Sequence, residues 1–173
     1  MRFTHSDLDA DTVRDLFVYD MASGDLIWRY PPFGKPSNRA RLAGQSAGSV
    51  KNGYVVISLA RKKYSAHRLV WLHVNGEWPA GEIDHIDGNK ANNRICNLRV
   101  ASRSENMRNV GAYRTSSTGI KGVCFHPQER KWRAQITLNR KTELVGRFDS
   151  IEAAQAAYEK AAKEKHGEFA RTN

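Results

Sequence analysis

The chain of 173 residues is poor in cysteine and proline, and it lacks long apolar runs. Its two cysteines, Cys96 and Cys124, cannot supply the four ligands of a structural zinc site, and the six histidines do not cluster to help. We expect both thiols to be free and buried or half-buried, because disulfides are rare in reducing compartments. No apolar stretch approaches the roughly 18 residues that suggest a membrane span, so none is expected.

The first eleven residues, MRFTHSDLDAD, are polar and acidic. They lack the apolar core of a secretory signal. The sequence therefore predicts an intracellular protein.

Positive charge dominates the chain and is unevenly distributed. There are 28 Lys and Arg against 18 Asp and Glu, a net charge of +10. Residues 1–25 contain two Arg and six Asp, a balance of −4, so the remaining 148 residues carry +14. This density is typical of nucleic-acid-binding proteins. Many merely soluble proteins are also basic, so charge alone leaves both readings open.

Hydrophobic patterning predicts mixed helix and strand in the N-terminal part. A short amphipathic helix is expected over Thr12–Phe17, and a tight turn leads into a strand over Tyr19–Trp28. A strand rich in β-branched residues is expected over Gly53–Leu59. After a basic turn at 61–63, its partner returns at 64–66.

A basic loop precedes that strand. Residues 31–49 hold three of the five prolines together with Lys35, Arg39 and Arg41. A solvated linker and an arm along a phosphate backbone are both consistent with this composition.

Residues 84–108, DHIDGNKANNRICNLRVASRSENMR, are the most informative stretch of the chain. A short strand over Glu82–Ile86 leads into an Asn-rich loop, and a second short strand covers Asn97–Val100. Ser102 and Glu105 have the spacing of a capping box that opens a helix.

Strand, loop, strand and helix can bring Asp84, His85, Asn97 and Asn106 to one point. A carboxylate suits a hard metal ion, and an imidazole titrates near neutral pH. With two amides, the set suits metal-assisted cleavage of a phosphodiester. An isolated Asp-His pair is usually incidental. The spacing of twelve residues from His85 to Asn97 and nine to Asn106 is far more specific.

The segment from about Ala66 through Asn109 resembles the HNH nucleases of the ββα-metal fold, in the homing-endonuclease branch of phages and their introns. This resemblance implies a DNA endonuclease encoded by a phage or mobile element, which would act in the cytoplasm of a bacterial host. It implies that His85 is the general base, that Asn97 holds His85 across the loop, and that a distorted strand end lets His85 and its neighbour converge.

The resemblance also implies a metal centre. Asp84 and Asn106 would bind one Mg²⁺ or Mn²⁺ per active site, and no zinc is expected. Basic side chains near the motif are candidates for DNA contacts: His67, Arg68, Arg99, Arg103 and Arg108. Trp71 and Trp78 are expected to lie in the core.

The C-terminal third predicts a small three-stranded sheet followed by one helix. Strands are expected over 122–126, 132–138 and 143–148. Asp149 and Glu152 have capping-box spacing before a helix with an alanine-rich apolar stripe.

The motifs TGIKGV, KWRAQI and VGRFD in this region resemble the plant ethylene-response-factor (Apetala-type) DNA-binding domain. That resemblance implies that the free sheet face enters the major groove. Several base-reading positions of the plant domain differ here, including those held by Cys124 and Leu144, so its target sequence does not carry over. The expected positive face comprises Lys121, His126, Arg130, Lys131, Arg133, Arg140, Lys141 and Arg147. A small protein-interaction domain is the alternative.

The sequence thus predicts an α+β protein with an HNH endonuclease domain over residues 1–110, made of a β-rich part (1–65) and a ββα-metal core (about 66–109). A linker (111–117) and a DNA-binding domain (118–173) follow. We expect a site-directed, nicking endonuclease that acts on double-stranded DNA as a monomer or weak dimer, without a small-molecule cofactor. The alternatives are a non-catalytic DNA-binding regulator on a decayed nuclease fold and a structure-selective repair nuclease.

Overall fold

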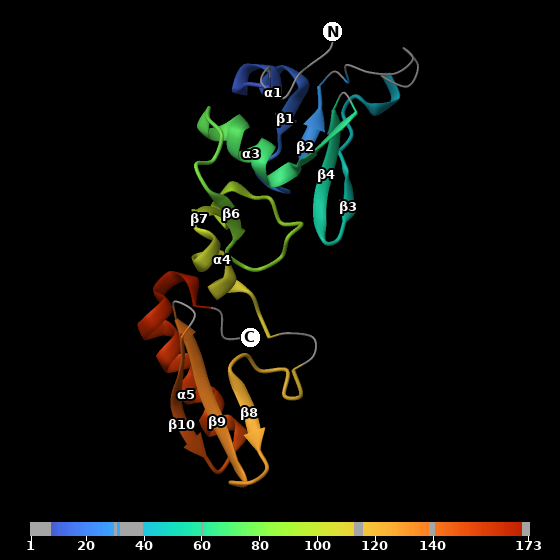
Figure 1. The fold of residues 1–173 in the computed structure, drawn as a ribbon. Coiled ribbons are helices and arrows are strands. Elements are labelled where there is room, and N and C mark those ends of the chain that lie inside the picture. Colours follow the sequence, from blue (N-terminus) through green and yellow to red (C-terminus); the bar gives the residue numbers. More distant parts are fainter. Residues whose placement is uncertain are drawn as a thin grey trace. The chain divides into compact units, whose positions relative to one another are not determined.

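The computed structural model describes residues 8–29, 31, 40–59, 61–112, 116–138 and 141–170. These residues form a mixed α/β fold with four small antiparallel sheets (Figure 1). None of the helices within these ranges has the length and apolar composition needed to cross a bilayer.

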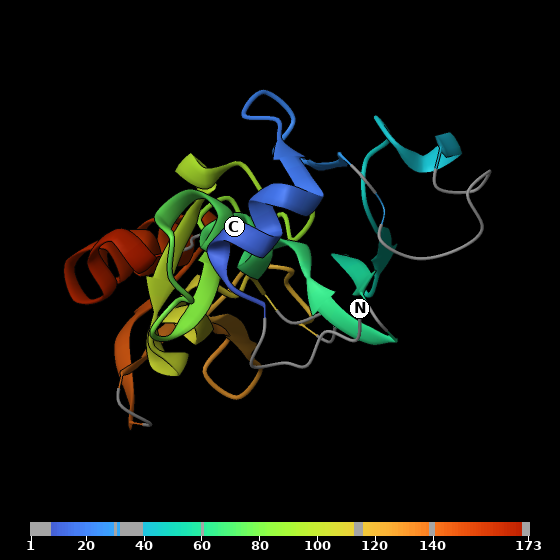
Figure 2. The same ribbon diagram turned by 90° about the horizontal axis from the view of Figure 1, so that it is seen from above.

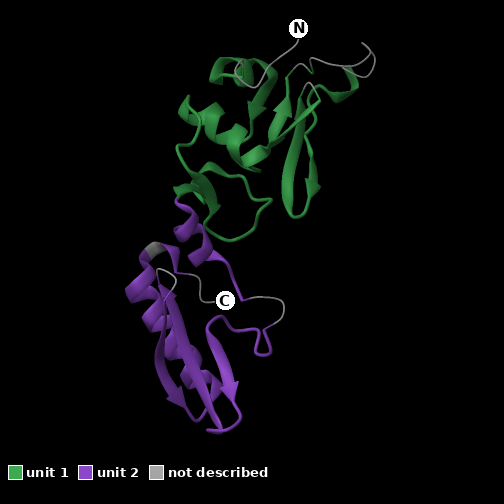
Figure 3. Ribbon diagram, in the orientation of Figure 1, with its two compact units in different colours: residues 1–101 green, residues 102–173 purple. Residues whose placement is uncertain are grey.

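The chain divides into two compact units, Met1–Ala101 and Ser102–Asn173 (Figure 3). The boundary expected from the sequence lies later, at residues 111–117. The division therefore assigns the helix after the second motif strand to the second unit. The domain boundaries named above stay a prediction.

The first unit opens with helix α1 (Ala10–Leu16), which is capped by the carboxylate of Asp9. The helix is one residue shorter at its end than the sequence predicts, because Phe17 adopts extended backbone and begins β1 (Phe17–Tyr19). β1 pairs antiparallel with β2 (Leu26–Trp28). The expected turn and strand over 19–28 are thereby observed.

A three-stranded sheet follows in the order β3 (Ser49–Lys51), β4 (Tyr54–Leu59) and β5 (Lys62–Ser65). An Asn-Gly turn with positive φ at both residues joins β3 to β4, as the twist of a two-residue hairpin requires. The basic turn expected at 61–63 is shorter than predicted, because its two lysines pair within β5.

Helix α3 (Ala66–Asn75) carries the centre of the first core. Its residues Leu69, Val70 and Leu72 are fully or almost fully buried, and α1 packs against it (Figure 2). The helix ends at Gly76, whose backbone is left-handed. Trp71 and Trp78 pack partly buried against this core, which confirms their predicted structural role.

The motif predicted over 84–108 is present as strand, loop, strand and helix. β6 (Glu82–His85) pairs antiparallel with β7 (Leu98–Ala101), and the short 3-10 helix η2 (Ile95–Asn97) precedes β7. Helix α4 (Arg103–Asn109) opens with the predicted capping box, in which the side chain of Ser102 and that of the third helical residue each accept a backbone hydrogen bond.

In the second unit, β8 (Val123–His126), β9 (Lys131–Leu138) and β10 (Lys141–Phe148) form an antiparallel sheet in the order β10-β9-β8. Helix α5 (Ile151–His166) covers one face of this sheet, and η3 (Gly167–Phe169) ends the described chain's secondary structure. The buried members of this core come from the sheet and from the stripe of α5: Val123, Ala134, Ile136, Ala154, Tyr158, Ala161 and Ala162.

The N-cap of α5 differs from the one predicted. Ser150, not Asp149, caps the helix, and its hydroxyl accepts a hydrogen bond from the N–H of Ala153 at 3.2 Å. Asp149 instead forms an ion pair with Lys131 across the sheet.

The two cysteines are both free. Cys124 is half-buried, as expected, whereas Cys96 is exposed and the expectation of burial was wrong for it. Cys96 lies in η2, whose neighbouring Ile95 provides the apolar contact to the core.

Gly122 allows β8 to approach α5 closely. Its φ is +72°, and a Cβ there would lie 2.3 Å from the Cε2 of Tyr158 and 2.5 Å from the carbonyl oxygen of Gln135. Gly119, with φ +67°, would meet nothing within 4 Å. The two glycines share a left-handed backbone, but only Gly122 lacks room for a Cβ atom.

We predict that Gly122→Ala lowers the free energy of unfolding by about 2–5 kcal/mol, because backbone strain and overpacking add. Gly119→Ala should cost only the strain, about 1–2 kcal/mol. Urea unfolding of the two variants measures the difference. Equal unfolding midpoints would show that the close approach at Gly122 is absent.

Candidate active site

Strand β6 delivers Asp84 and His85, which are both 4% exposed. Asp84 lies opposite Arg99 and His85 lies opposite Leu98 in a regular antiparallel register. The distorted strand end implied by the resemblance is therefore absent from the register. Both side chains are nevertheless buried.

The Asn-rich loop fixes the imidazole of His85. Its Nε2 lies 3.1 Å from the Oδ1 of Asn93, a side chain that is only 1% exposed. An amide oxygen only accepts hydrogen bonds, so Nε2 carries the proton in this arrangement. The basic lone pair of His85 therefore lies on Nδ1.

Sequence reasoning missed Asn93. Asn93 stands among Asn89 and Asn92 in a loop rich in turn formers, so composition gave no reason to single it out. The signal that distinguishes Asn93 is burial of an amide beneath a histidine, and it appears only once the loop has closed.

Asn97 closes that loop. Its Nδ2 donates to the Oδ1 of Asp87 at 2.9 Å and to the carbonyl of Asn92 at 2.8 Å, and its Oδ1 accepts from the N–H of Asp87 at 3.0 Å. These hydrogen bonds place the Asn97 side chain across the loop. Its link to His85 runs through the backbone, where the N–H of Ile86 donates to the carbonyl of Asn97.

Asp87 is the acidic member of this closure. Burial raises the pKa of its carboxyl, but hydrogen bonds from Asn92, Asn89 and Asn97 outweigh burial and hold the pKa below its usual range. Asp87 therefore stays ionised at neutral pH and remains an acceptor for the loop amides.

Arg99, a candidate for a DNA contact, forms an ion pair with Asp84. Its Nη2 and Nε lie 2.7 and 2.8 Å from the Oδ2 of Asp84, whose side chain is 5% exposed. Both contacts fall on one carboxylate oxygen. The pair orients a buried carboxylate beside His85.

Aromatic rings surround His85. The ring of His67 lies edge-on at 5.1 Å between centroids, and Tyr54 lies 5.5 Å from His67 and 6.1 Å from His85. The ammonium of Lys90 stands 4.8 Å above the Tyr54 ring. A positive side chain therefore lies at the exposed side of this ring cluster.

His67 is buried and neutral. Burial, and then the nearby His85 and Arg68, lower its pKa to about 4. Its Nδ1 has no hydrogen-bond partner within the described residues. An unpartnered buried nitrogen of this kind calls for a water, a ligand or an ion.

Asp84 is the residue of this group that fits a hard divalent cation, because it offers a buried carboxylate oxygen. The neutral imidazole of His67, whose Nδ1 has no partner among the described residues, suits a hydrogen bond better than a hard metal ion. No three His, Cys, Asp or Glu side chains gather as a metal cluster in the part of the chain that the structure describes. Mg²⁺ suits such a sparse site, because it is usually held by one or two carboxylates together with substrate phosphates and water.

The other expected metal ligand, Asn106, lies in α4 of the second unit and is half-buried. Within the first unit, the structure brings together Asp84, His85, Asn97 and Arg99, with His67 beside them.

Arg68, an expected DNA contact, has contacts within the fold. Its Nη1 donates to the carbonyl of Gly81 at 3.1 Å, and its guanidinium lies 5.8 Å from the ring centre of Trp78. These contacts fix the segment between α3 and β6.

In the second unit, Glu129 lies in the turn between β8 and β9 and binds basic side chains of the sheet. Arg133 donates to its carboxylate through Nε and Nη2 at 3.1 and 2.5 Å, and Arg147 donates through Nε at 2.9 Å. The hydrogen bond from Arg133 is the largest cause that lowers the pKa of Glu129 to about 2. Burial raises this pKa, and the hydrogen bond from Arg147 lowers it further. The Nδ1 of His126 lies 3.9 Å from the Oε2 of Glu129.

Other predicted DNA contacts have different positions. Lys121 donates to the carbonyls of Arg108 and Val110 at the end of α4. The exposed positions among the remaining candidates are Arg103, Arg130 and Lys141. Arg140 and the basic-loop residues Lys35 and Arg39 lie outside the described residues.

Comparison with known proteins finds a family model and relatives that match the segment of this site. A family model described as HNH endonuclease matches residues 64–108, the segment that carries the candidate catalytic residues. The chain is 36% identical over 106 residues to Protein 3.8 of Escherichia phage T7, covering 61% of this chain and 87% of that protein.

A second relative is an uncharacterized HNH endonuclease of Acanthamoeba polyphaga mimivirus. It is 34% identical over 125 residues, covering 71% of this chain and 64% of that protein, so the chain spans less than two thirds of its length. No solved structure matches the chain.

Proposed function

We propose that this chain is a metal-dependent endonuclease that hydrolyses phosphodiester bonds of double-stranded DNA. The match of residues 64–108 to the HNH endonuclease family model supports a nuclease with DNA as its substrate. The observation that carries the proposal is the buried pair on β6. Asp84 is held by Arg99, and His85 is fixed in one tautomer by Asn93.

His85 acts as the general base. Its Nε2–H donates to Asn93, so its Nδ1 takes the proton of the attacking water. Asn97 supports this base indirectly, because it closes the loop that carries Asn93. The base is thereby oriented before substrate arrives, which removes the need to order it during the reaction.

Asp84 and Asn106 would hold one Mg²⁺ or Mn²⁺, which would stabilise the charge that develops on the phosphate and on the departing 3′-oxygen. Arg99 orients the Asp84 carboxylate. The neutral ring of His67 lies at 5.1 Å from His85 and directs its Nδ1 toward a phosphate oxygen of the strand being cut.

The C-terminal sheet binds DNA and directs the nuclease to its site, in the manner of a homing endonuclease. Support comes from the free face, where Arg133 and Arg147 lie side by side across β9 and β10. Glu129 holds both guanidinium groups in place. One catalytic set in each chain makes a single-strand nick the expected product.

The first prediction concerns the base. His85→Ala should slow nicking of a supercoiled plasmid by about 10²–10⁴-fold, because a positioned base contributes that factor. Asn93→Ala keeps the imidazole but removes its partner, so about 10–100-fold should be lost. DNA affinity measured in EDTA should not change in either variant.

Asn89→Ala is the matched control, because Asn89 is an exposed residue of the same loop. It should cut at nearly the parent rate. If His85→Ala retains more than about a tenth of that rate, His85 is not the general base.

The second prediction concerns the metal. Cleavage should require Mg²⁺ or Mn²⁺ and stop in EDTA. Asp84→Ala and Asn106→Ala should each raise the metal concentration that gives half-maximal rate. The double variant should lose no more than the worse single variant, because the shared ion is lost only once. Effects that multiply would show that the two residues act on different steps.

The third prediction concerns the sheet. Arg133→Ala and Arg147→Ala should each weaken DNA binding and lower the dependence of log K on log salt by about one. Lys160→Ala, an exposed charge on the opposite side of the unit in α5, is the matched control. Filter binding across a salt series measures all three. A control that loses as much as the arginine variants would reduce the effect to overall charge.

A further inference from the structure

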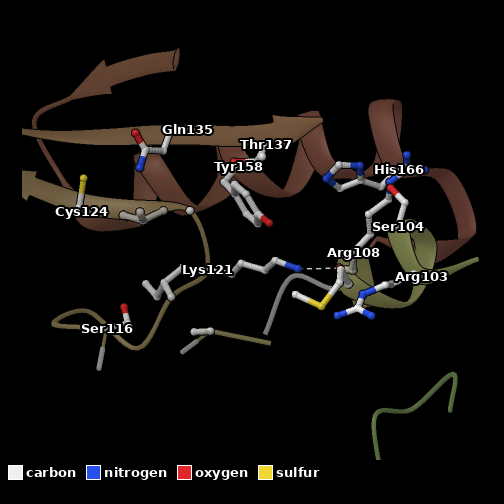
Figure 4. A pocket seen from close by; sticks show the side chains of 15 residues that line it. Arg103, Ser104, Arg108, Ser116, Lys121, Cys124, Gln135, Thr137, Tyr158 and His166 are labelled. Carbon is white, nitrogen blue, oxygen red and sulfur yellow. Dashed lines mark hydrogen bonds between the residues drawn. The ribbon is translucent and has the colours of Figure 1, made fainter. Parts of the chain in front are cut away.

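The second unit contains a cavity of about 770 Å³ (Figure 4). It is lined by α4, by the segment that leads into β8, by β9 and by the buried side of α5. Its size lies within the roughly 300–1,000 Å³ of pockets that bind small molecules. The residues that line it do not include Glu129, Arg133 or Arg147.

The cavity is strongly cationic. Arg103 and Arg108 reach it from α4, and Lys121 reaches it from the segment before β8. Lys121 is fixed there by hydrogen bonds to the carbonyls of Arg108 and Val110 at 2.6 and 2.5 Å. None of the described residues that line the cavity is acidic. Fixed cations without a compensating carboxylate attract an anion.

A buried histidine faces the same space. His166 is 6% exposed, and its Nδ1 has no hydrogen-bond partner in the described parts of the chain. Figure 4 shows its ring and the Tyr158 hydroxyl turned toward the space that Lys121 crosses. Leaving a buried polar atom without a partner costs free energy, and a bound ligand would supply the missing hydrogen bond.

The ionisation of the two α5 side chains suits this role. Burial, and then Arg108 and Lys121, lower the pKa of His166, so the ring is neutral in the empty cavity and can gain a proton beside an anion. Burial raises the pKa of Tyr158 to about 12, so its hydroxyl remains a hydrogen-bond donor at neutral pH.

We propose that this cavity binds a nucleoside phosphate. The phosphate lies among Arg103, Arg108 and His166, because guanidinium forks match phosphate oxygens in geometry and charge. The sugar and base lie along the apolar wall made by Met107, Ile120 and Val123. A bare anion would leave most of this wall in contact with water.

The choice of a nucleotide over other anions that carry an apolar group rests on the proposed function. Loss of a 3′-oxygen leaves a phosphate on the 5′ end of the cut strand, so the reaction itself produces this chemistry. Two sources are possible for the same ligand: a free mononucleotide, or the 5′-terminal nucleotide of a cut strand.

Calorimetric titration of the full chain in EDTA tests the proposal. The probes are dAMP, deoxyadenosine, inorganic phosphate, and a four-nucleotide strand with or without a 5′-phosphate. We expect dAMP to bind at least tenfold more tightly than either deoxyadenosine or phosphate. If the phosphorylated strand displaces dAMP and the unphosphorylated strand does not, the strand end is the source. If only dAMP binds, the free nucleotide is the source.

Arg108→Gln and His166→Phe should each weaken dAMP binding about tenfold, the factor expected for one lost charge-assisted hydrogen bond. Lys163→Gln removes a charge from an exposed position of α5 that does not line the cavity, and it should bind as the parent does. If His166→Phe does not fold, two other measurements test the proposal. Arg108→Gln should still bind dAMP more weakly, and the NMR signals of the His166 ring should shift when dAMP is added to the parent chain.

Absence of dAMP binding, or equal loss in Lys163→Gln and Arg108→Gln, would overturn the proposal. Its failure is distinguishable from that of the proposed nuclease. A chain that nicks plasmid without binding dAMP has lost only the cavity site, whereas a chain that binds dAMP without nicking has lost only the nuclease. His85→Ala should bind dAMP as the parent does.

Discussion

The three hydrogen bonds of the Asn97 carboxamide are the constraint on which the candidate active site depends. They close the loop between β6 and η2 by joining Asp87 to the backbone of Asn92. Closure buries Asn93 beneath His85. A two-stranded sheet is marginal by itself, so the loop and the neighbouring α3 core supply the rigidity that a positioned base requires.

A second constraint is that much of the positive charge is held by partners within the fold. Arg99 is held by Asp84, and Arg133 and Arg147 share Glu129. Lys121 is held by the carbonyls at the end of α4. Side chains that are already ordered lose less conformational entropy when a phosphate binds, so this preorganisation favours binding in one geometry. Several of the positive side chains that give the sequence its net charge are therefore held in fixed orientations by partners within the fold.

The elements of the motif could be predicted because local rules agree with the final packing. The capping box at Ser102 and the alanine stripe of α5 required no knowledge of distant residues. Where the sequence misled, a distant partner decided the outcome. Asp149 and Ser150 are both good N-caps, and only the lysine across the sheet draws Asp149 away. Asn93 could not be separated from its neighbouring asparagines, since its role arises from burial after loop closure.

The bulge in β10 has a consequence for how copies of the chain meet. Register shifts between Leu144 and Gly146, where one extra residue stands opposite β9. β10 forms one edge of its sheet, and β8, only four residues long, forms the other. A bulge kinks an edge strand and increases its twist, which makes it a poor template for a strand from another molecule. The sheet is therefore guarded against edge-to-edge aggregation at both of its margins.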